Sequence, residues 1–290
     1  MSSKIVILGG SGYIGRELSK FLQLSDPLAD LVVLGSKDID LTTRAAANDL
    51  DDILDEHTTL YICAGIKKQL GDNLENFKRN LEITQSIVAS KKVTQCKKTI
   101  FLSSAEVYGE NINSLSISEK SPCMPSSYYG LAKKTSEDLF DLVYQKSGAR
   151  GLVVVRMPLV YGPRESQNIY GPSGFFANAK AGKVQTLWGD GSEKRNFLFI
   201  DDLIQALSCM GNSDFEGLIN IANSRSNSFK DVIDTLENLR LNLSINQKAR
   251  SKEKVNQGYD ISLLKKTFQN FKPHSLEQGL SKMLSTEGGR

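Results

Sequence analysis

The chain has 290 residues, of which 40% are hydrophobic and 24% are charged, and its formal net charge is +3. This composition is ordinary for a soluble globular protein of one large or two small domains. A small charge without a basic stripe argues against nucleic acid as a partner, and no run approaches the roughly 18 apolar residues of a membrane-spanning helix. We therefore expect a cytoplasmic protein without a membrane partner.

Histidine and cysteine are sparse. The chain has only two histidines, His57 and His274, so neither a zinc site nor a Ser-His-Asp triad is expected. Its four cysteines lie far apart and form no C-x-x-C pair, which predicts reduced thiols that are mostly buried. They are Cys63, Cys96, Cys123 and Cys209. We expect no bound metal, and any acid–base chemistry must use other groups.

A glycine-rich segment near the start of the chain has the pattern of a dinucleotide-binding turn. It reads Gly9-Gly10-Ser11-Gly12-Tyr13-Ile14-Gly15, between an apolar run at residues 5–8 and an amphipathic run at 16–24. Such glycines permit a tight turn, close approach of the backbone to a pyrophosphate and packing of helix on strand. The unpaired N–H groups at the helix start attract phosphate. The pattern predicts dinucleotide binding, with a glycine-rich turn without a ligand as the alternative.

Strand and helix signals alternate through the first half of the chain. Further strands are expected at residues 30–34, 60–65, 99–104 and 151–156, with a short and less clear one at 38–41; helices are expected at 44–54, 75–90 and 127–146. This alternation predicts an α/β fold with a doubly wound parallel sheet. Ligands of such sheets bind outside the carboxyl ends of the strands.

The second half changes character. Prolines and glycines between residues 158 and 191 predict loops and a lid rather than regular sheet. Strands are expected at 197–200 and 217–222, and helices at 201–210, 229–239 and 275–284. We predict a dinucleotide-binding domain over 1–157, to which 196–224 returns, and a smaller α/β substrate lobe over 158–290.

One tyrosine and one lysine lie four residues apart on a predicted helix. Tyr129 and Lys133 share a helical face, and Ser104 ends a strand 25 residues earlier. A tyrosine has a pKa of about 10, and a nearby ammonium and a cationic nicotinamide ring would lower it. Tyr129 could then exchange a proton with a bound hydroxyl or ketone that Ser104 holds. By itself, Tyr-x-x-x-Lys is more often an ordinary surface pair.

Together these segments resemble the short-chain dehydrogenase/reductase superfamily, in its extended branch of nucleotide-sugar epimerases, dehydratases and reductases. The matching phrases are the glycine turn, Ser103–Gly109, Tyr129-x-x-x-Lys133, Tyr161-Gly162-Pro163, Gly189-Asp190-Gly191, Arg195-Asn196-Phe197 and Asp201-Asp202. The resemblance extends from residue 4 to about residue 284. It implies a nucleotide-diphosphate sugar as substrate, a role in polysaccharide biosynthesis, and a homodimer formed by the helices at 75–90 and 127–146.

The resemblance also implies site residues. The catalytic set is Ser104, Tyr129 and Lys133, with Glu106 as a further base or only a substrate ligand. The cofactor-binding residues are Gly9, Gly12, Tyr13, Ile14, Gly15, Ala64, Gly65, Asn80, Tyr129, Lys133 and Pro158. The substrate-binding residues are Ser104, Glu106 and Arg195, and Arg195 would bind the nucleotide diphosphate. Relatives often have an asparagine at position 159, where this chain has Leu159.

The segment after the second strand decides between cofactors. Enzymes that use NAD usually have an acidic residue about 20 positions beyond the glycine turn, on the ribose 2′-hydroxyl. Here that place reads Gly35-Ser36-Lys37, and Ser36 with Lys37 could hold a 2′-phosphate, which favours NADP. The segment is similar to that of NADP-dependent 4-keto-6-deoxysugar reductases, in which Asp40 and Leu41 would flank the adenine. The alternative is that Asp38 turns inward and selects NAD.

Three reactions share this scaffold. A 4,6-dehydratase carries an acid beside the serine, where this chain has the methyl of Ala105. A 4-epimerase must retain NAD, and a 4-keto reductase needs only NADPH and the Ser-Tyr-Lys set. We predict NADPH-dependent reduction of a nucleotide-linked 4-keto-6-deoxyhexose, with an NAD-dependent 4-epimerase or dehydratase as the alternative. An NADP-sensing protein without activity is the alternative of another class.

Overall fold

The computed structural model describes residues 3–165, 171–250 and 252–287. The contacts divide the chain into two compact units. The first consists of Met1–Glu110, Ser121–Arg156 and Ile204–Ile219, and the second of Asn111–Lys120, Met157–Leu203 and Asn220–Arg290. The boundaries that the sequence suggests for a cofactor domain and a substrate lobe stay a prediction.

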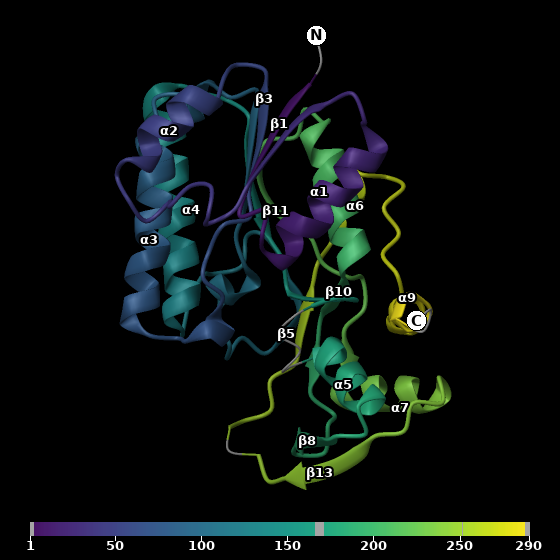
Figure 1. Cartoon of the computed structure of the whole chain (residues 1–290). Helices are drawn as coiled ribbons and strands as arrows, with labels where there is room; N and C mark the ends of the chain where they lie inside the picture. Colours follow the sequence, from purple (N-terminus) through teal and green to yellow (C-terminus); the bar gives the residue numbers. More distant parts are fainter. Residues whose placement is uncertain (1–2, 166–170, 251, 288–290) are drawn as a thin grey trace. The chain divides into compact units, whose positions relative to one another are not determined.

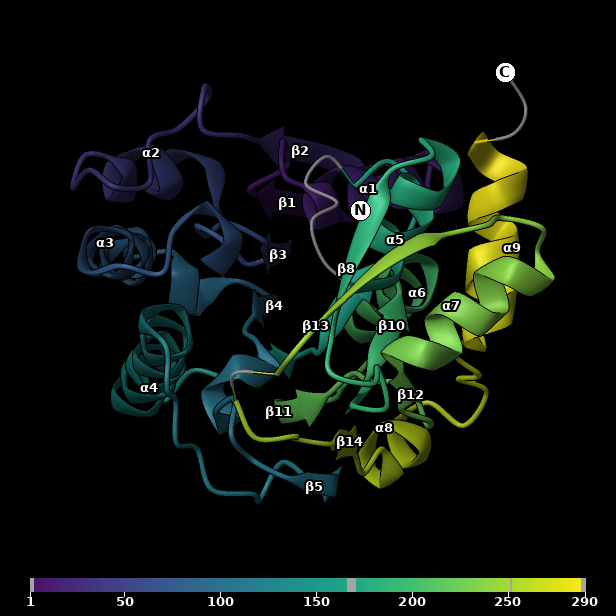
Figure 2. The ribbon, with the colours of Figure 1, turned by 90° about the horizontal axis from the view of Figure 1, so that it is seen from below.

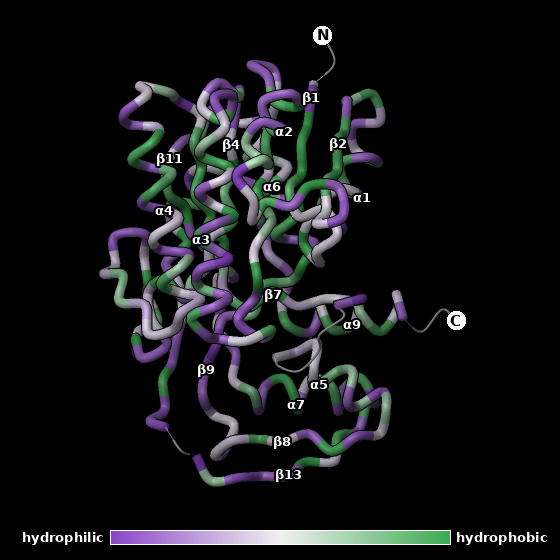
Figure 3. The backbone as a smooth tube through the Cα atoms, turned by 60° about the vertical axis from the view of Figure 1, so that its left-hand side comes forward, coloured by the Kyte–Doolittle hydropathy of each residue, from purple (hydrophilic) through white to green (hydrophobic). Residues whose placement is uncertain are grey.

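The first unit is built on a six-stranded sheet in the order β11-β6-β4-β3-β1-β2. The strands are β1 (Lys4–Leu8), β2 (Asp30–Leu34), β3 (Thr58–Ile62), β4 (Lys98–Leu102), β6 (Leu152–Arg156) and β11 (Gly217–Asn220). The pairings β1–β2, β1–β3, β3–β4 and β4–β6 are parallel. After Lys4, strand β1 is hydrophobic and buried, as expected for a strand covered on both faces (Figure 3). The predicted α/β fold with a doubly wound sheet is confirmed.

Helices cover both faces of this sheet. They are α1 (Tyr13–Ser25), α2 (Ala46–Ile53), α3 (Leu74–Ala89), α4 (Tyr128–Ser147) and α6 (Ile200–Gly211). Figure 1 shows α2, α3 and α4 on one face and α1 and α6 on the other. A core of buried residues between α2, α3, α4 and the sheet includes Leu8, Leu50, Ile62 and Phe140. The sheet order reverses direction at β1, where ligands of such folds bind.

The short strand expected at residues 38–41 is absent, because this segment forms turns. Ile39 and Leu41 are buried as expected for a strand, but the backbone N–H groups of Asp38 and Ile39 both donate to the carbonyl of Gly35. Asp40 then caps the next turn by accepting from Thr42. Alternating apolar residues therefore reach the core without extended backbone, and β2 is left at the edge of the sheet.

In its described residues, the second unit contains four pairs of short strands. They are β5 (Ser114–Ile117) with β14 (Gln257–Tyr259), β7 (Leu159–Tyr161) with β10 (Phe197–Phe199), β8 (Val184–Trp188) with β13 (Ser244–Lys248), and β9 (Lys194–Arg195) with β12 (Asn227–Ser228). Its helices are α5 (Gly171–Lys180), α7 (Phe229–Asn238), α8 (Ser262–Thr267) and α9 (Leu276–Glu287). Figure 2 shows β8 and β13 side by side, and their register is parallel.

The expectation of loops alone between residues 158 and 191 is wrong. This stretch holds β7, α5 and β8, and residues 166–170 lie outside the described part. The side chains of Phe175 and Phe176 are buried, and the ring of Phe175 stacks on Phe229 with centroids 6.0 Å apart. Burial of these two rings supports a helix that the local glycines and proline disfavour.

The expectation that most cysteines are buried is also wrong. All four are free, but only Cys96 is buried and Cys209 is exposed on α6. Cys209 lies on the solvent-facing side of the helix, whereas Leu207 and Met210 lie on the side that is buried, so its position on the helix decides its exposure. Within residues 3–165, 171–250 and 252–287, no helix is long and apolar enough to cross a membrane.

Candidate active site

The glycine turn follows β1 directly and leads into α1. Gly9 has a φ of +84°, and a Cβ atom placed on it would lie 2.6 Å from the backbone nitrogen of Ala64. A Cβ on Gly15 would lie 2.4 Å from the carbonyl oxygen of Gly9. Gly12, which precedes α1, has more room, since its Cβ would meet only that same oxygen, at 3.2 Å. The turn and the uncapped start of α1 therefore fit a pyrophosphate group.

Two further members of the predicted cofactor site begin α1. Tyr13 is buried and Ile14 is half-buried. The ammonium of Lys67 lies 5.9 Å from the centre of the Tyr13 ring. The turn therefore has a packed tyrosine on the side where β3 ends, and the cofactor contacts of both residues stay predictions.

An acidic side chain does reach the end of β2. Asp38 accepts a hydrogen bond from the backbone N–H of Gly35, with 2.8 Å between nitrogen and Oδ2. A Cβ on Gly35 would lie 2.9 Å from the hydroxyl of Ser11 in the glycine turn. Ser36 and Lys37 are exposed in the same turn. The structure thus brings both possible selectors, the acid for NAD and the Ser-Lys pair for NADP, to one place.

Asp40 and Leu41 follow within the same connection. The carboxylate of Asp40 accepts from the hydroxyl and the backbone N–H of Thr42, at 2.7 and 3.0 Å. Both contacts lower the pKa of Asp40. Leu41 is buried in the core. Each side chain therefore has a local structural role, and their predicted contact with an adenine stays a prediction.

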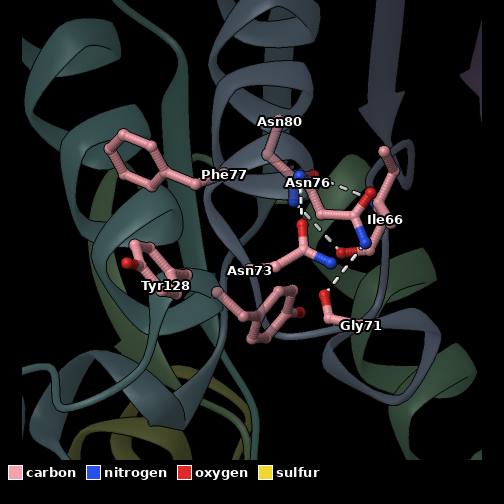
Figure 4. Close-up of a pocket in the computed structure, with 8 residues that line it drawn as sticks. Ile66, Gly71, Asn73, Asn76, Phe77, Asn80 and Tyr128 are labelled. Atoms are coloured by element: carbon pink, nitrogen blue, oxygen red, sulfur yellow. Dashed lines mark hydrogen bonds between the residues drawn. The ribbon is translucent and has the colours of Figure 1, made fainter.

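The end of β3 is held by Asn80 of α3. Its amide oxygen accepts from the N–H of Ile66 at 2.8 Å, and its amide nitrogen donates to the carbonyl of Ile66 at 3.1 Å (Figure 4). Through these two bonds to Ile66, the Asn80 side chain fixes the backbone directly after Ala64 and Gly65. A Cβ on Gly65 would lie 3.3 Å from the Lys133 ammonium and 3.4 Å from the Asn80 oxygen. These four residues of the predicted cofactor site are therefore brought together.

A small pocket lies beside this turn. Asn73, Asn76, Phe77, Asn80, Tyr128 and Tyr129 are among the residues that line it (Figure 4). Its polar side chains already serve the local chain: Asn73 caps α3 by accepting from the N–H of Asn76, and Asn76 donates to the carbonyl of Gly71. We therefore assign this pocket to the support of the Ile66–Asn73 segment and not to a ligand.

Ser104, Tyr129 and Lys133 meet at the end of β4. The Tyr129 phenol lies close enough to the Ser104 hydroxyl for that hydroxyl to lower its pKa, and the Lys133 ammonium donates to the carbonyl of Leu102 at 2.8 Å. Ser127 caps the start of α4 by accepting from the N–H of Gly130, and Asp72 accepts from the N–H of Tyr129. The first turn of the helix that presents Tyr129 is therefore fixed at two points.

The protein environment shifts the pKa of both groups on α4. Burial raises the pKa of Tyr129 to about 12; the hydrogen bond from Ser104 lowers it, and the charge of Glu106 raises it. Burial lowers the pKa of Lys133 to about 8, while Cys63 and Glu137 act in the opposite direction. The expected lowering of the tyrosine pKa is thus not seen in the protein without cofactor, because desolvation of the phenolate outweighs the favourable contact.

Glu106 is held by a lysine that sequence reasoning missed. The Lys68 ammonium lies 3.0 Å from a carboxylate oxygen of Glu106 and also contacts Glu110. Burial lowers the pKa of Lys68, but the charges of Glu106 and Glu110 outweigh it and raise the pKa above its ordinary value. Ser127 also donates to Glu106, at 3.4 Å. No motif marks Lys68, because its partner is 38 residues away in the chain.

The predicted diphosphate contact lies in the second unit, where Arg195 shares a buried acid with a second arginine. Glu193 is buried and contacts the guanidinium groups of both Arg195 and Arg250. Arg195 also donates to the carbonyl of Val255. Arg250, from the charged segment after β13, was not predicted as a site residue. Two guanidinium groups against one carboxylate leave an excess of positive charge suited to an anionic ligand.

Two positions named from the sequence, Pro158 and Leu159, also lie in the second unit, and the cofactor contact of Pro158 stays a prediction. Pro158 is half-buried between β6 and β7. Leu159 packs against Gly171, since a Cβ on that glycine would lie 2.8 Å from the leucine side chain. Trp188 is exposed, with the Lys248 ammonium 5.6 Å from its ring centre. Among the described residues, no group of three or more His, Cys, Asp or Glu side chains could hold a metal ion.

The arrangement in the first unit can exchange a proton with a bound hydroxyl or carbonyl oxygen. Tyr129 carries the exchangeable proton, and Ser104 can hold the same oxygen. The glycine turn, the end of β2 and the buried Lys133 are placed around the carboxyl ends of β1 to β4, where a dinucleotide would lie. These residues therefore fit a nicotinamide dinucleotide.

Comparison with known proteins gives the family. Residues 5–222 match the model of the NAD dependent epimerase/dehydratase family. A Bacillus subtilis protein called an uncharacterized UDP-glucose epimerase is 25% identical, over 96% of both chains. Other curated relatives are longer, and this chain spans 39% of one of them.

Solved structures have the same fold. The UDP-glucose 4-epimerase of Thermotoga maritima, determined with UDP-glucose, is 21% identical with a TM-score of 0.82 over 98% of both chains. The UDP-glucuronic acid 4-epimerase of Bacillus cereus, determined with UDP-glucuronic acid and NAD, is 24% identical with a TM-score of 0.81, over 97% of this chain and 98% of the other.

Proposed function

Because this chain belongs to the NAD dependent epimerase/dehydratase family, we propose that it is a nucleotide-sugar 4-epimerase that works with NAD. The observation that carries the proposal is the hydroxyl pair of Ser104 and Tyr129, followed by the methyl group of Ala105. This set can exchange a hydroxyl proton but offers no acid at position 105 for the elimination of water. The proposal replaces the reductase as first choice, since several of the curated and structural relatives are named as 4-epimerases or UDP-glucose epimerases.

The proposed roles follow from the geometry. Bound NAD supplies reversible hydride transfer. Tyr129 takes the proton of the sugar 4-hydroxyl and returns it, while Ser104 holds that oxygen. The pKa of Tyr129 is about 12 in the protein alone, so a positive charge beside the ring is needed to stabilise the phenolate. Lys133 is held by Leu102 facing the Ala64-Gly65 turn, where we place the nicotinamide ribose.

NAD is proposed over NADP because of Asp38. Its carboxylate lies at the end of β2 near Ser11, where it suits a ribose 2′-hydroxyl and repels a 2′-phosphate. The exposed Ser36 and Lys37 are the specific observation that favours the second candidate, an NADPH-dependent reductase of nucleotide 4-keto-6-deoxysugars. We propose Arg195 and Arg250 as the diphosphate contacts of either enzyme.

A homodimer is proposed through the outer surfaces of α3 and α4. Leu131 and Leu142 are exposed on α4, three turns apart on one face, and Leu74 is exposed at the start of α3. Phe140 points into the core and Leu139 and Val143 are half-buried, so the exposed leucines are the better measure of a partner surface. The proposed location is the cytoplasm.

The deciding experiment is incubation of the purified protein with UDP-glucose and UDP-glucuronic acid, with and without added NAD, with NMR detection of the 4-epimer. A parallel assay follows NADPH oxidation with nucleotide 4-keto-6-deoxysugars. Formation of a 4-epimer without net change of cofactor supports the epimerase. Keto-sugar-dependent loss of NADPH would establish the reductase instead. If the protein binds NADPH but turns over neither class of sugar, and if Tyr129→Phe leaves that binding unchanged, the NADP-sensing protein without activity is supported.

A further inference from the structure

Three side chains spaced by four on α4 each contact one of three consecutive residues at the end of β4. The helix members are Tyr129, Lys133 and Glu137, and the strand members are Ser104, Leu102 and Ser103 respectively. Two of these contacts involve the proposed catalytic groups. The third, from the Ser103 hydroxyl to the Glu137 carboxylate, has no role in the proposed chemistry.

Glu137 is a buried carboxylate that accepts three hydrogen bonds. Arg156 donates to it through two nitrogens, Nε at 2.9 Å and Nη2 at 2.6 Å, in addition to the Ser103 hydroxyl. The exposed fractions are 5% for Glu137, 5% for Arg156 and 0% for Ser103. A charge pair this deep is costly to desolvate and is weak evidence for stability by itself. What a bidentate pair does supply is a fixed relative position of the groups that it joins.

Besides its two hydrogen bonds to Glu137, Arg156 contacts a third segment of the chain. It is the last residue of β6, and its guanidinium lies 4.8 Å from the centre of the Tyr108 ring, in the short helix after Ser104. The Glu137–Arg156 pair therefore connects the ends of β4 and β6 with α4. Apolar side chains tolerate sliding between such elements, whereas a bidentate pair with a third hydrogen bond fixes their register.

We infer that Glu137 and Arg156 are positioning residues that hold Tyr129 and Lys133 in register with Ser104. The inference rests on the proposed role of these three residues. Glu137 stands one helical turn beyond Lys133 on the same face, and Ser103 is bonded directly to Ser104 in the chain. A shift of α4 along the sheet would therefore move the tyrosine and lysine relative to the serine together.

Glu137 also acts on Lys133 through its charge. The groups that face the Lys133 ammonium are Cys63 at the end of β3, Glu137 on α4, and the Leu102 carbonyl and the Phe101 ring of β4. Among these, Glu137 is a carboxylate, and its charge raises the pKa of Lys133 against the effect of burial. Loss of that charge makes the ammonium easier to deprotonate.

The test compares Glu137→Gln, the apolar double variant Glu137→Met/Arg156→Met, and Asp138→Asn as the control. Asp138 is the next residue on α4 and pairs with Lys134 on the exposed side. Turnover is measured with the nucleotide sugar that the wild type converts, and melting temperature and NAD affinity are measured beside it. The titration of Lys133 is followed by NMR of 13Cε-labelled lysine, with the resonance assigned by its loss in Lys133→Met.

We expect Glu137→Gln to lower the NMR midpoint of Lys133 by about one pH unit, and the control to leave it unchanged. We expect the double variant to melt near the wild-type temperature, since a buried pair can be replaced by apolar residues, but to lose about 100-fold in kcat because register is lost. Recovery of both stability and kcat in the double variant would overturn the inference. If the double variant does not fold, wild-type kcat and an unshifted Lys133 midpoint in Glu137→Gln overturn it. A wild type that turns over no sugar is a failure of the proposed function instead, and the Lys133 midpoint still tests the pair.

Discussion

The carboxylate of Asp38 accepts a hydrogen bond from the backbone N–H of Gly35 at 2.8 Å. This contact holds an acid at the end of β2, three residues later than the usual NAD-selecting position. The short turn between them makes the difference, because the chain folds back after Lys37 and returns Asp38 to the strand end. Cofactor preference therefore depends on the shape of this turn.

We predict that the protein binds NAD more tightly than NADP, and that Asp38→Asn weakens NAD binding by about ten-fold, the value of one hydrogen bond to a charged group. The same substitution should improve NADP binding by removing like-charge repulsion. Isothermal titration calorimetry with both cofactors measures this. Asp30→Asn, at the opposite end of the same strand, should change neither affinity. Tighter binding of NADP by the wild type would contradict the prediction.

Two glycines of the turn should respond differently to alanine. Gly15→Ala places a Cβ 2.4 Å from the Gly9 carbonyl oxygen, so we expect a loss of stability of about 1–3 kcal/mol from overpacking. Gly12→Ala meets the same oxygen only at 3.2 Å and should fold, but it fills the space for the pyrophosphate and should weaken NAD at least about ten-fold. Urea unfolding and calorimetry separate the two effects. Equal stability losses in both variants would argue against this division of roles.

The pH dependence of turnover should follow the charge near Tyr129. Glu106 raises the pKa of Tyr129, so Glu106→Gln should lower it and move the ascending limb of kcat/KM to lower pH. Lys68→Met removes the ammonium that offsets the charge of Glu106 and should move the limb to higher pH. We expect each movement to be about half to one pH unit, since these groups are partly exposed.

Glu110→Gln is the matched control for this pair of variants, because Glu110 contacts Lys68 but is not among the groups that raise the pKa of Tyr129. The profiles are measured with the nucleotide sugar that the wild type converts. Movement of the limb in the same direction for Lys68→Met and Glu106→Gln would show that the two residues do not act through charge.

The proposed dimer has a direct test. Leu131→Glu with Leu142→Glu places two charges on the exposed face of α4, and we expect the solution mass to fall from that of two chains to that of one. Leu24→Glu, on the exposed face of α1, should leave the mass unchanged. Light scattering after size-exclusion chromatography measures both. A wild type that elutes as a single chain would remove the basis of the proposal.

Most strands and helices of the first half follow from local pattern, and their boundaries agree with the sequence predictions to within a few residues. For example, the strand expected at residues 30–34 is β2, and the helix expected at 127–146 is α4. The exceptions are the strand expected at 38–41, which is absent, and β5, which was not predicted. The second half was less predictable. Short strands such as β8 and β13 pair across 60 residues of chain, and β13 is exposed throughout, so its sequence carries no burial pattern.

By itself, the amino-acid sequence determined the α/β fold, the glycine turn after the first strand, and a tyrosine and a lysine on one face of a helix. These features depend on residues a few positions apart, whose geometry is set by the period of a strand or helix. Only the tertiary structure decided where Asp38 points, that Lys68 pairs with Glu106, and that Glu137 and Arg156 form a buried pair beside Ser103. In these cases the shape of a turn or a contact between distant segments places the charge, and no local pattern in the sequence encodes either of them.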